Sequence, residues 1–208
     1  MEELWRYEDP LRAEGKVLCG VDEAGAGPLM GPVYAAAVIL PREAELPGLN
    51  DSKKLTEKRR ETLYDRILDQ AIAWSVARAE AAEIDALDIL NARMLAMQKA
   101  LDGLTLRPDL ALIDGNRDHG SRYAIEIPHR LIVGGDGKSA SIAAASILAK
   151  VSRDRYVSTE LDAKYPQYQF AKHKGYGTKL HYEMLDQYGP CPEHRRTFLK
   201  KWEAKRHG

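Results

Sequence analysis

The sequence contains few cysteines and no long apolar run. Only two of its 208 residues are cysteine, Cys19 and Cys191, which excludes a disulfide framework and favours a reducing compartment. Residues 33–40 form the longest notable apolar run, far shorter than the roughly 20 residues that a membrane helix needs. Residues 1–10 are acidic and lack the apolar core of a signal peptide. We therefore expect a cytoplasmic protein with no membrane association.

The sequence also has no net charge, so overall charge predicts no partner. Lysine plus arginine and aspartate plus glutamate both number 31. The distribution is uneven, because residues 171–208 hold nine lysines and arginines against four acids. By itself this excess is typical of a solvated helical tail. With 44% hydrophobic and 30% charged residues, the chain has the composition of one substantial globular domain.

Short apolar segments alternate with longer amphipathic ones. A helix is expected to open at Thr56, a second to carry the apolar stripe from Ile84 to Leu101, and a third to be capped by Ser139. The alternation of strands with helices predicts a mixed α/β sheet. Strands are predicted at residues 16–22, 32–40, 71–80, 109–114 and 130–133.

Three of these predicted strands lead into acidic residues next to glycines. Asp22 and Glu23 follow the first strand, Asp114 closes the fourth, and Asp136 follows the fifth. Ligands of open α/β sheets gather at the carboxyl ends of strands, so these acids are candidates for one site. Carboxylates without histidine or cysteine favour Mg²⁺ or Mn²⁺ over Zn²⁺. Two such ions about 4 Å apart activate water for phosphodiester hydrolysis.

Glu23 poses a geometric problem, because adjacent residues of a strand point to opposite faces. Its side chain joins Asp22 only if the strand ends or bulges there. Alternatively, Glu23 contributes through its backbone carbonyl. The sequence leaves both readings open.

Two glycine-containing segments resemble nucleotide-binding motifs, but the spacing of their glycines does not match. Gly25, Gly27 and Gly31 are one residue too widely spaced for the dinucleotide fingerprint. Residues 137–139 end like a Walker A loop, but Ile132 stands where its first glycine belongs. Neither loop is predicted.

A basic stretch, residues 172–185, mixes cations with an aromatic side chain. Lys172, Lys174 and Lys179 are candidates to neutralise phosphates, and Tyr176 to stack on a sugar or base. The alternative is a basic turn with a half-buried tyrosine.

Six segments, followed by HRRTF, occur in a fixed order between about residue 17 and residue 198. They are VDEAGAGPLMGPV, NDSKKL, IDALDILNARMLAMQKAL, LIDGN, GDGKSASIAAASILAKVSRDR and YPQYQFAKHKGYGTKLH. In this order they resemble the ribonuclease HII (type 2 ribonuclease H) family. The resemblance implies a ribonuclease H-like mixed sheet flanked by helices, with a helical C-terminal extension. It further implies a catalytic core at residues 1–160 and a substrate-binding portion at residues 161–208, packed on the core.

The resemblance also implies an activity. We expect a monomeric, metal-dependent endoribonuclease with a two-ion site for Mg²⁺ or Mn²⁺. Its substrates would be RNA in RNA/DNA hybrids and duplex DNA that contains ribonucleotides, which it would incise on the 5′ side of the ribonucleotide. Carried over by position, the metal-binding acids are Asp22, Glu23, Asp114 and Asp136, whereas Asp154 is taken as structural.

The remaining site residues concern the substrate. In the resemblance, the turn at Gly25, Ala26 and Gly27 contacts the ribose 2′-hydroxyl through backbone groups, which distinguishes RNA from DNA. Tyr176 matches a tyrosine that stacks on the neighbouring deoxyribose. The substrate backbone would be contacted by Lys53 and Lys174.

The sequence departs from the family pattern at two positions. Ala26 replaces an arginine, and Gly134 stands where a lysine often precedes Gly-Asp. A charge-assisted contact to phosphate contributes roughly 1.5 to 3 kcal/mol, so substrate affinity is expected to suffer more than metal chemistry. The alternative functions are therefore a hybrid- or junction-binding protein with weakened catalysis, and another nuclease of the same fold.

Overall fold

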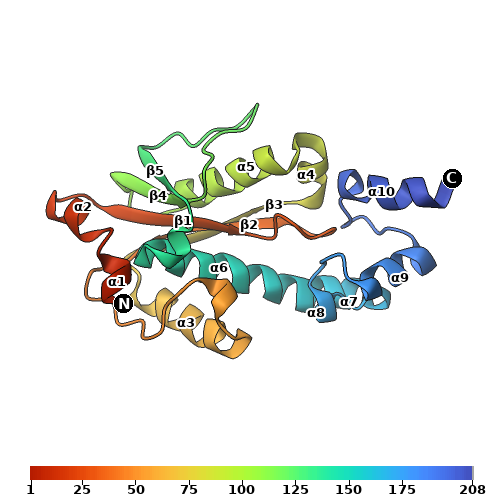
Figure 1. The fold of residues 1–208 in the computed structure, drawn as a ribbon, viewed down its shortest axis with the longest axis horizontal. Helices are drawn as coiled ribbons and strands as arrows, with labels where there is room; N and C mark the ends of the chain where they lie inside the picture. The colour runs from red at the N-terminus through yellow and green to blue at the C-terminus, as the bar shows by residue number, and fades with distance from the viewer. Residues whose placement is uncertain (208) are drawn as a thin grey trace.

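The computed structural model describes residues 1–207 and is built on a five-stranded mixed sheet (Figure 1). The strand order is β3-β2-β1-β4-β5. β1 pairs antiparallel with β2, and β2 with β3, whereas β1, β4 and β5 run parallel. The predicted strands are confirmed with shifted ends. Their bounds are β1 Leu18–Ala24, β2 Val33–Ile39, β3 Ala73–Ala79, β4 Leu110–Asp114 and β5 His129–Ile132.

Helices cover both faces of the sheet. In Figure 1, α4 and α5 lie on one face, and α3 and α6 lie on the other. The main helices are α3 Glu57–Gln70, α4 Ala81–Leu87, α5 Ile89–Asp102, α6 Ala140–Tyr156, α9 Lys179–Tyr188 and α10 Arg196–His207. The short ones are α1 Glu2–Trp5, α2 Asp9–Ala13, α7 Asp162–Lys164 and α8 Phe170–His173, with 3₁₀ turns η1 Ser52–Lys54, η2 Gly135–Gly137 and η4 Pro166–Tyr168 and a π turn, η3 Val157–Leu161.

The core lies in two layers because β2 is buried on both sides. Ala35 and Ala37 pack toward α5, whereas Ala36 and Val38 pack toward α6, as the two-residue period of a strand requires. At Gly20, a Cβ atom would lie only 2.0 Å from the backbone carbon of Ser141. The glycine therefore lets the first turn of α6 lie directly on β1.

Two predicted helix starts are confirmed and one predicted helix is interrupted. Thr56 and Ser139 each cap a helix by accepting a backbone hydrogen bond three residues on. The single helix predicted through Ile84 and Leu101 is wrong, because the chain turns at Asp88. This residue has φ of 74°, and its side chain caps α5 by accepting from the amide of Asn91. The apolar stripe continues across the break, so periodicity alone did not reveal it.

The C-terminal portion packs on the glycine-rich loop, residues 25–32. α6 continues through η3 into α7, so residue 160 lies within one helical run. The amide of Leu29 donates to Gly175, and the amide of Gly31 donates to Glu193. The loop after β1 is thereby fixed by segments far along the chain.

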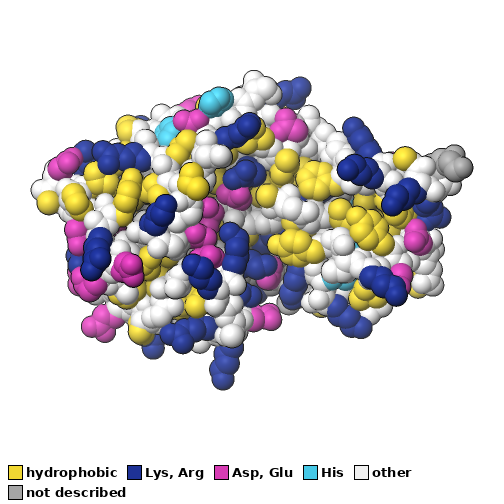
Figure 2. Space-filling model, viewed as in Figure 1, with side chains coloured by type: hydrophobic (Ala, Val, Ile, Leu, Met, Phe, Trp, Pro, Cys, Tyr) yellow, Lys and Arg dark blue, Asp and Glu magenta, His cyan; other side chains and the backbone are white. Residues whose placement is uncertain are grey.

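No helix within residues 1–207 combines the length and the apolar character needed to cross a membrane. The face seen in Figure 2 carries basic and acidic side chains interspersed among smaller apolar areas.

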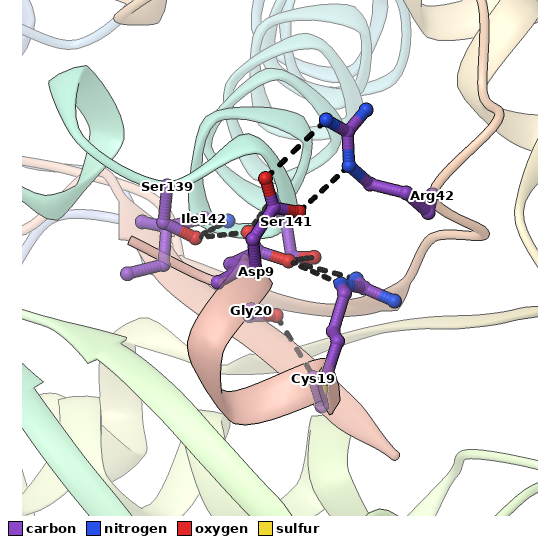
Figure 3. Close-up of polar contacts among 9 residues, drawn as sticks. Asp9, Cys19, Gly20, Arg42, Ser139, Ser141 and Ile142 are labelled. Atoms are coloured by element: carbon purple, nitrogen blue, oxygen red, sulfur yellow. Dashed lines mark hydrogen bonds and ion pairs between the residues drawn. The ribbon is translucent and has the colours of Figure 1, made fainter. Parts of the chain in front are cut away.

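A buried carboxylate fixes the N-terminal segment to the start of α6. Glu8 is fully buried and accepts hydrogen bonds from the hydroxyls of Ser139 and Ser141 and from the amide of Ser141. Arg12 pairs with its second oxygen at 2.7 Å. Figure 3 shows Ser139 and Ser141 against the N-terminal helix, with Arg42 paired to Asp9 nearby. Glu8 therefore anchors the turn that immediately follows Asp136.

We predict that Glu8→Gln destabilises the protein by about 3 kcal/mol, because an amide group cannot accept all the hydrogen bonds that reach the carboxylate. Denaturant unfolding measures this change. Glu3→Gln, at an exposed position of the same segment, is the control and should cost under about 0.5 kcal/mol. Equal unfolding midpoints for the two variants would contradict the role given to Glu8.

Candidate active site

Three acids from separate elements meet at one edge of the sheet. Asp22 lies near the end of β1, Asp114 is the last residue of β4, and Asp136 lies in η2. One carboxylate oxygen of each lies within 4.8 Å of the others. The parallel arrangement of β1, β4 and β5 produces this convergence, because their carboxyl ends reach the same edge.

The acid cluster, defined as Asp22, Asp114 and Asp136, carries strong mutual repulsion. Asp22 is only 5% exposed, and its pKa is raised well above the usual range, first by burial and then by Glu23 and Asp114. Burial, followed by the charge of Asp114, likewise raises the pKa of Asp136. Lys53 lies 3.7 Å from Asp136, but its side chain is 78% exposed. Only oxygen ligands are present, so the cluster fits a hard divalent cation.

Glu23 does not join this cluster through its side chain. β1 continues through Ala24, so Glu23 points to the face covered by α5, where its carboxylate lies 2.6 Å from Arg93. The second carboxylate oxygen of Glu23 and the Nε of Arg93 are buried and have no hydrogen-bond partner among residues 1–207. Burial raises the pKa of Glu23, although Arg93 opposes that shift.

The backbone of Glu23 faces the cluster's side of the strand. Val17 uses its amide and its carbonyl to bind Asp109 at the start of β4. The side to which backbone groups point alternates along a strand, so Glu23, six residues on in unbroken register, also faces β4. Asp114 ends that strand. Of the two readings left open by the sequence, this geometry favours the backbone carbonyl.

A cleft of about 230 Å³ adjoins the cluster. It is lined by eight of the ten residues singled out in the sequence, together with Lys150, which was not predicted. Figure 2 shows acidic side chains near the middle of the molecule with basic side chains beside them. The predicted residues in the lining are Asp22, Glu23, Gly25, Ala26, Gly27, Lys53, Asp114 and Tyr176.

Lys150 and Tyr176 form one wall of the cleft. Tyr176 is 42% exposed, and the ammonium group of Lys150 lies 5.7 Å from the centre of its ring. Lys150 also pairs with Asp154 at 2.9 Å, which places Asp154 on α6 outside the acid cluster. No sequence signal marked Lys150, because the side of α6 that faces the cleft is known only from the fold.

Lys174 is not among the residues lining the cleft. Its ammonium group donates to the hydroxyl of Ser158, and its carbonyl accepts from Arg153. Asp136 also lies outside the lining, although one of its carboxylate oxygens lies within 4.8 Å of oxygens of the other two acids.

Sequence reasoning missed two buried arginines behind the glycine-rich loop. Arg153 and Arg195 are fully buried and donate to backbone carbonyls of residues 25–32. Both lie in segments quoted above, SRDR and HRRTF, where nothing in the sequence indicated that they are buried.

The mixed sheet, the helices on its two faces and the acids at its strand ends define a nuclease of the ribonuclease H-like class. The family model described as Ribonuclease HII matches residues 19–205. The chain belongs to the ribonuclease HII family and is accordingly an endoribonuclease, as the resemblance predicted.

Individual relatives agree with this assignment. A ribonuclease HII of Caldicellulosiruptor bescii is 51% identical over 200 residues, which cover 96% of this chain and 95% of that protein. The crystal structure of ribonuclease H2 from Pyrococcus horikoshii matches with a TM-score of 0.71 at 28% identity, covering 86% of this chain and 92% of that one. A ribonuclease HII in complex with PCNA, from Archaeoglobus fulgidus, matches with a TM-score of 0.72 at 26% identity, covering 86% and 93%. The expected fold, including the helical C-terminal region, is confirmed.

We predict that Mg²⁺ or Mn²⁺ raises the melting temperature by about 5 to 10 °C when present at roughly 100 times its dissociation constant. Asp22→Asn should abolish this response. Without metal, this variant should melt at the same or a higher temperature than the wild type, because a buried charge is removed. Differential scanning calorimetry measures both effects. Asp154→Asn, outside the cluster, should keep the metal response, and its loss there would contradict the assignment.

Proposed function

We propose that this endoribonuclease cleaves RNA in RNA/DNA hybrids and incises duplex DNA on the 5′ side of an embedded ribonucleotide. The observation that carries the proposal is the convergence of Asp22, Asp114 and Asp136 beside a cleft that also contains Tyr176. A site that merely bound nucleic acid would gain nothing from three acids facing a polyanion.

The proposed metal ligands are the carboxylates of Asp22, Asp114 and Asp136 and the backbone carbonyl of Glu23. These groups would hold two Mg²⁺ or Mn²⁺ ions, which would supply activation of water and neutralisation of the scissile phosphate for a cleavage that leaves 3′-hydroxyl and 5′-phosphate ends. Arg93 holds the Glu23 side chain on the opposite face of the sheet. This contact fixes the strand from which the carbonyl projects.

The proposed substrate contacts come from two parts of the chain. The turn formed by Gly25, Ala26 and Gly27 recognises the 2′-hydroxyl, and the exposed ring of Tyr176 stacks on the adjacent deoxyribose. Lys53 contacts a phosphate, for which its exposed ammonium group is suited. Lys174 is proposed for the same role, although its ammonium group donates one hydrogen bond to Ser158.

The proposed division of labour assigns catalysis to residues 1–160 and substrate binding to residues 161–208. Its support is that Tyr176, from the second portion, lines the same cleft as acids from the first. We further propose that the protein acts as a monomer in the cytoplasm, in keeping with two buried, unpaired cysteines.

We predict that the wild type, with Mg²⁺ or Mn²⁺, incises a DNA duplex holding one ribonucleotide and leaves the matching all-DNA duplex intact. Asp22→Asn should lower the activity by more than roughly 100-fold. Removal of a residue that only supports a metal ligand costs roughly 10- to 100-fold, and Asp22 is a proposed ligand itself. Gel analysis of end-labelled duplexes measures both. Absence of incision with either ion would refute the proposal, and strong cleavage of the all-DNA duplex would indicate another nuclease activity of the same fold.

We predict that Ala26→Arg tightens binding of the ribonucleotide-containing duplex by about tenfold or more, because a guanidinium group gains a charge-assisted contact to phosphate. Fluorescence anisotropy at fixed salt measures the dissociation constant. Ala13→Arg adds the same charge at an exposed position on α2 and is the control. Equal tightening by both variants would mean that net charge alone is responsible.

A further inference from the structure

Arg195 makes an unusual set of contacts for a buried arginine. Its side chain is fully buried and donates to the carbonyls of Gly25, Ala26, Pro28 and Gly31 at 2.7 to 3.0 Å. No carboxylate lies within ion-pair distance of it among residues 1–207. The charge is therefore satisfied almost entirely by backbone oxygens of one loop.

These contacts fix the direction of the neighbouring amides. The structure has no cis peptide bond, and in a planar trans peptide the N–H points opposite to the C=O. Because the carbonyls of Gly25 and Ala26 point to Arg195, the amides of Ala26 and Gly27 point away from it. The next case in the loop agrees: the carbonyl of Pro28 also binds Arg195, and the amide of Leu29 points elsewhere, to Gly175.

The side away from Arg195 is the cleft. Gly25, Ala26 and Gly27 all line it, together with Asp22 and Tyr176. The amides of Ala26 and Gly27 have no acceptor in the part of the chain that the structure describes. Pro28 and Pro32 have no amide hydrogen to offer. Because Arg195 binds the carbonyls on one side of the loop, the unpaired amides of Ala26 and Gly27 face the substrate cleft on the other side.

We propose that Arg195 is a positioning residue for ribose recognition, which turns the amides of Ala26 and Gly27 into the cleft as a paired donor for the 2′-oxygen. This inference rests on the proposed function of the turn. It assigns the recognition of the sugar to a side chain that lies behind the turn and does not touch the substrate. Through Arg195, the C-terminal segment thereby contributes to the distinction between RNA and DNA.

A lysine at this position would not replace the arginine. The guanidinium group is planar and presents five donors in a rigid fork, whereas an ammonium group has three donors around one nitrogen. Arg195→Lys keeps the charge but cannot hold four carbonyls spread over residues 25–31. The loop should then reorient the two amides even though the buried charge persists.

The test measures binding rather than turnover. In an Asp22→Asn background, which prevents cleavage, dissociation constants are determined for a duplex with one ribonucleotide and for the matching all-DNA duplex. Their ratio is the ribose preference. Adding Arg195→Lys should lower this ratio by about tenfold, the effect of losing one to two hydrogen bonds. Affinity for the all-DNA duplex should change little.

The control separates positioning from stability. Ile67→Ala opens a cavity under α3, in the layer that packs on α6, and should lower the melting temperature without lowering the ribose preference. An unchanged ratio in Arg195→Lys, or an equal fall in Ile67→Ala, would overturn the inference. If the Asp22→Asn parent shows no ribose preference, the proposed recognition by the turn fails instead.

A second pair of variants tests the two amide donors, on which the inference depends, if Arg195→Lys does not fold. Ala26→Pro removes one of the two donors and leaves Arg195 unchanged, and the φ of Ala26 is not positive. Ala26→Gly keeps the donor. Loss of ribose preference in the proline variant alone would support the part of the inference that concerns the amides. Retention of the preference in both variants would overturn it.

Discussion

The structure depends on the satisfaction of two buried guanidinium charges by backbone carbonyls. A charge removed from water must be fully hydrogen-bonded, and here Arg153 and Arg195 find their acceptors mostly in residues 25–32. Burial lowers the pKa of Arg195 to about 9, which still leaves it protonated at neutral pH. If the loop after β1 moved, these buried charges would lose their hydrogen-bond acceptors. Strand, loop and C-terminal segment therefore behave as one unit around the cleft.

The acid cluster depends on a different constraint, which is strand topology. β1, β4 and β5 run parallel, so Asp22, Asp114 and the turn carrying Asp136 reach the same edge. Glu8 and Gly20 hold α6 against this edge, the first by hydrogen bonds and the second by allowing close approach. Burial, together with the charges of the neighbouring acids, raises the pKa of Asp22 and Asp136, and a cation bound there would relieve the repulsion between these acids.

Local sequence signals predicted much of this arrangement. The hydrogen bonds between residues far apart in the sequence could not be predicted from them. Thr56 and Ser139 were recognisable as helix caps, and the acids were recognisable from their places after apolar strands. The break at Asp88 was missed because a positive φ leaves no trace in hydrophobic periodicity. Arg195 was missed for a deeper reason. Its partners are carbonyls 164 to 170 residues away, and a carbonyl is present at every position of a sequence.

The absence of an arginine at position 26 has a different meaning in this structure than in the sequence. The sequence suggested a turn deprived of positive charge, but the interior places Arg195 directly behind that turn, bound to the carbonyls of Gly25 and Ala26. A cation at the carbonyl side of a peptide polarises its amide on the other side, which strengthens the amide as a donor. Phosphate affinity needs a side chain that reaches the substrate, whereas sugar recognition needs only oriented amides. In the proposed arrangement, Ala26 therefore separates these two tasks: the turn lacks a side chain for phosphate, and the recognition of the sugar is left to amides held by the buried arginine.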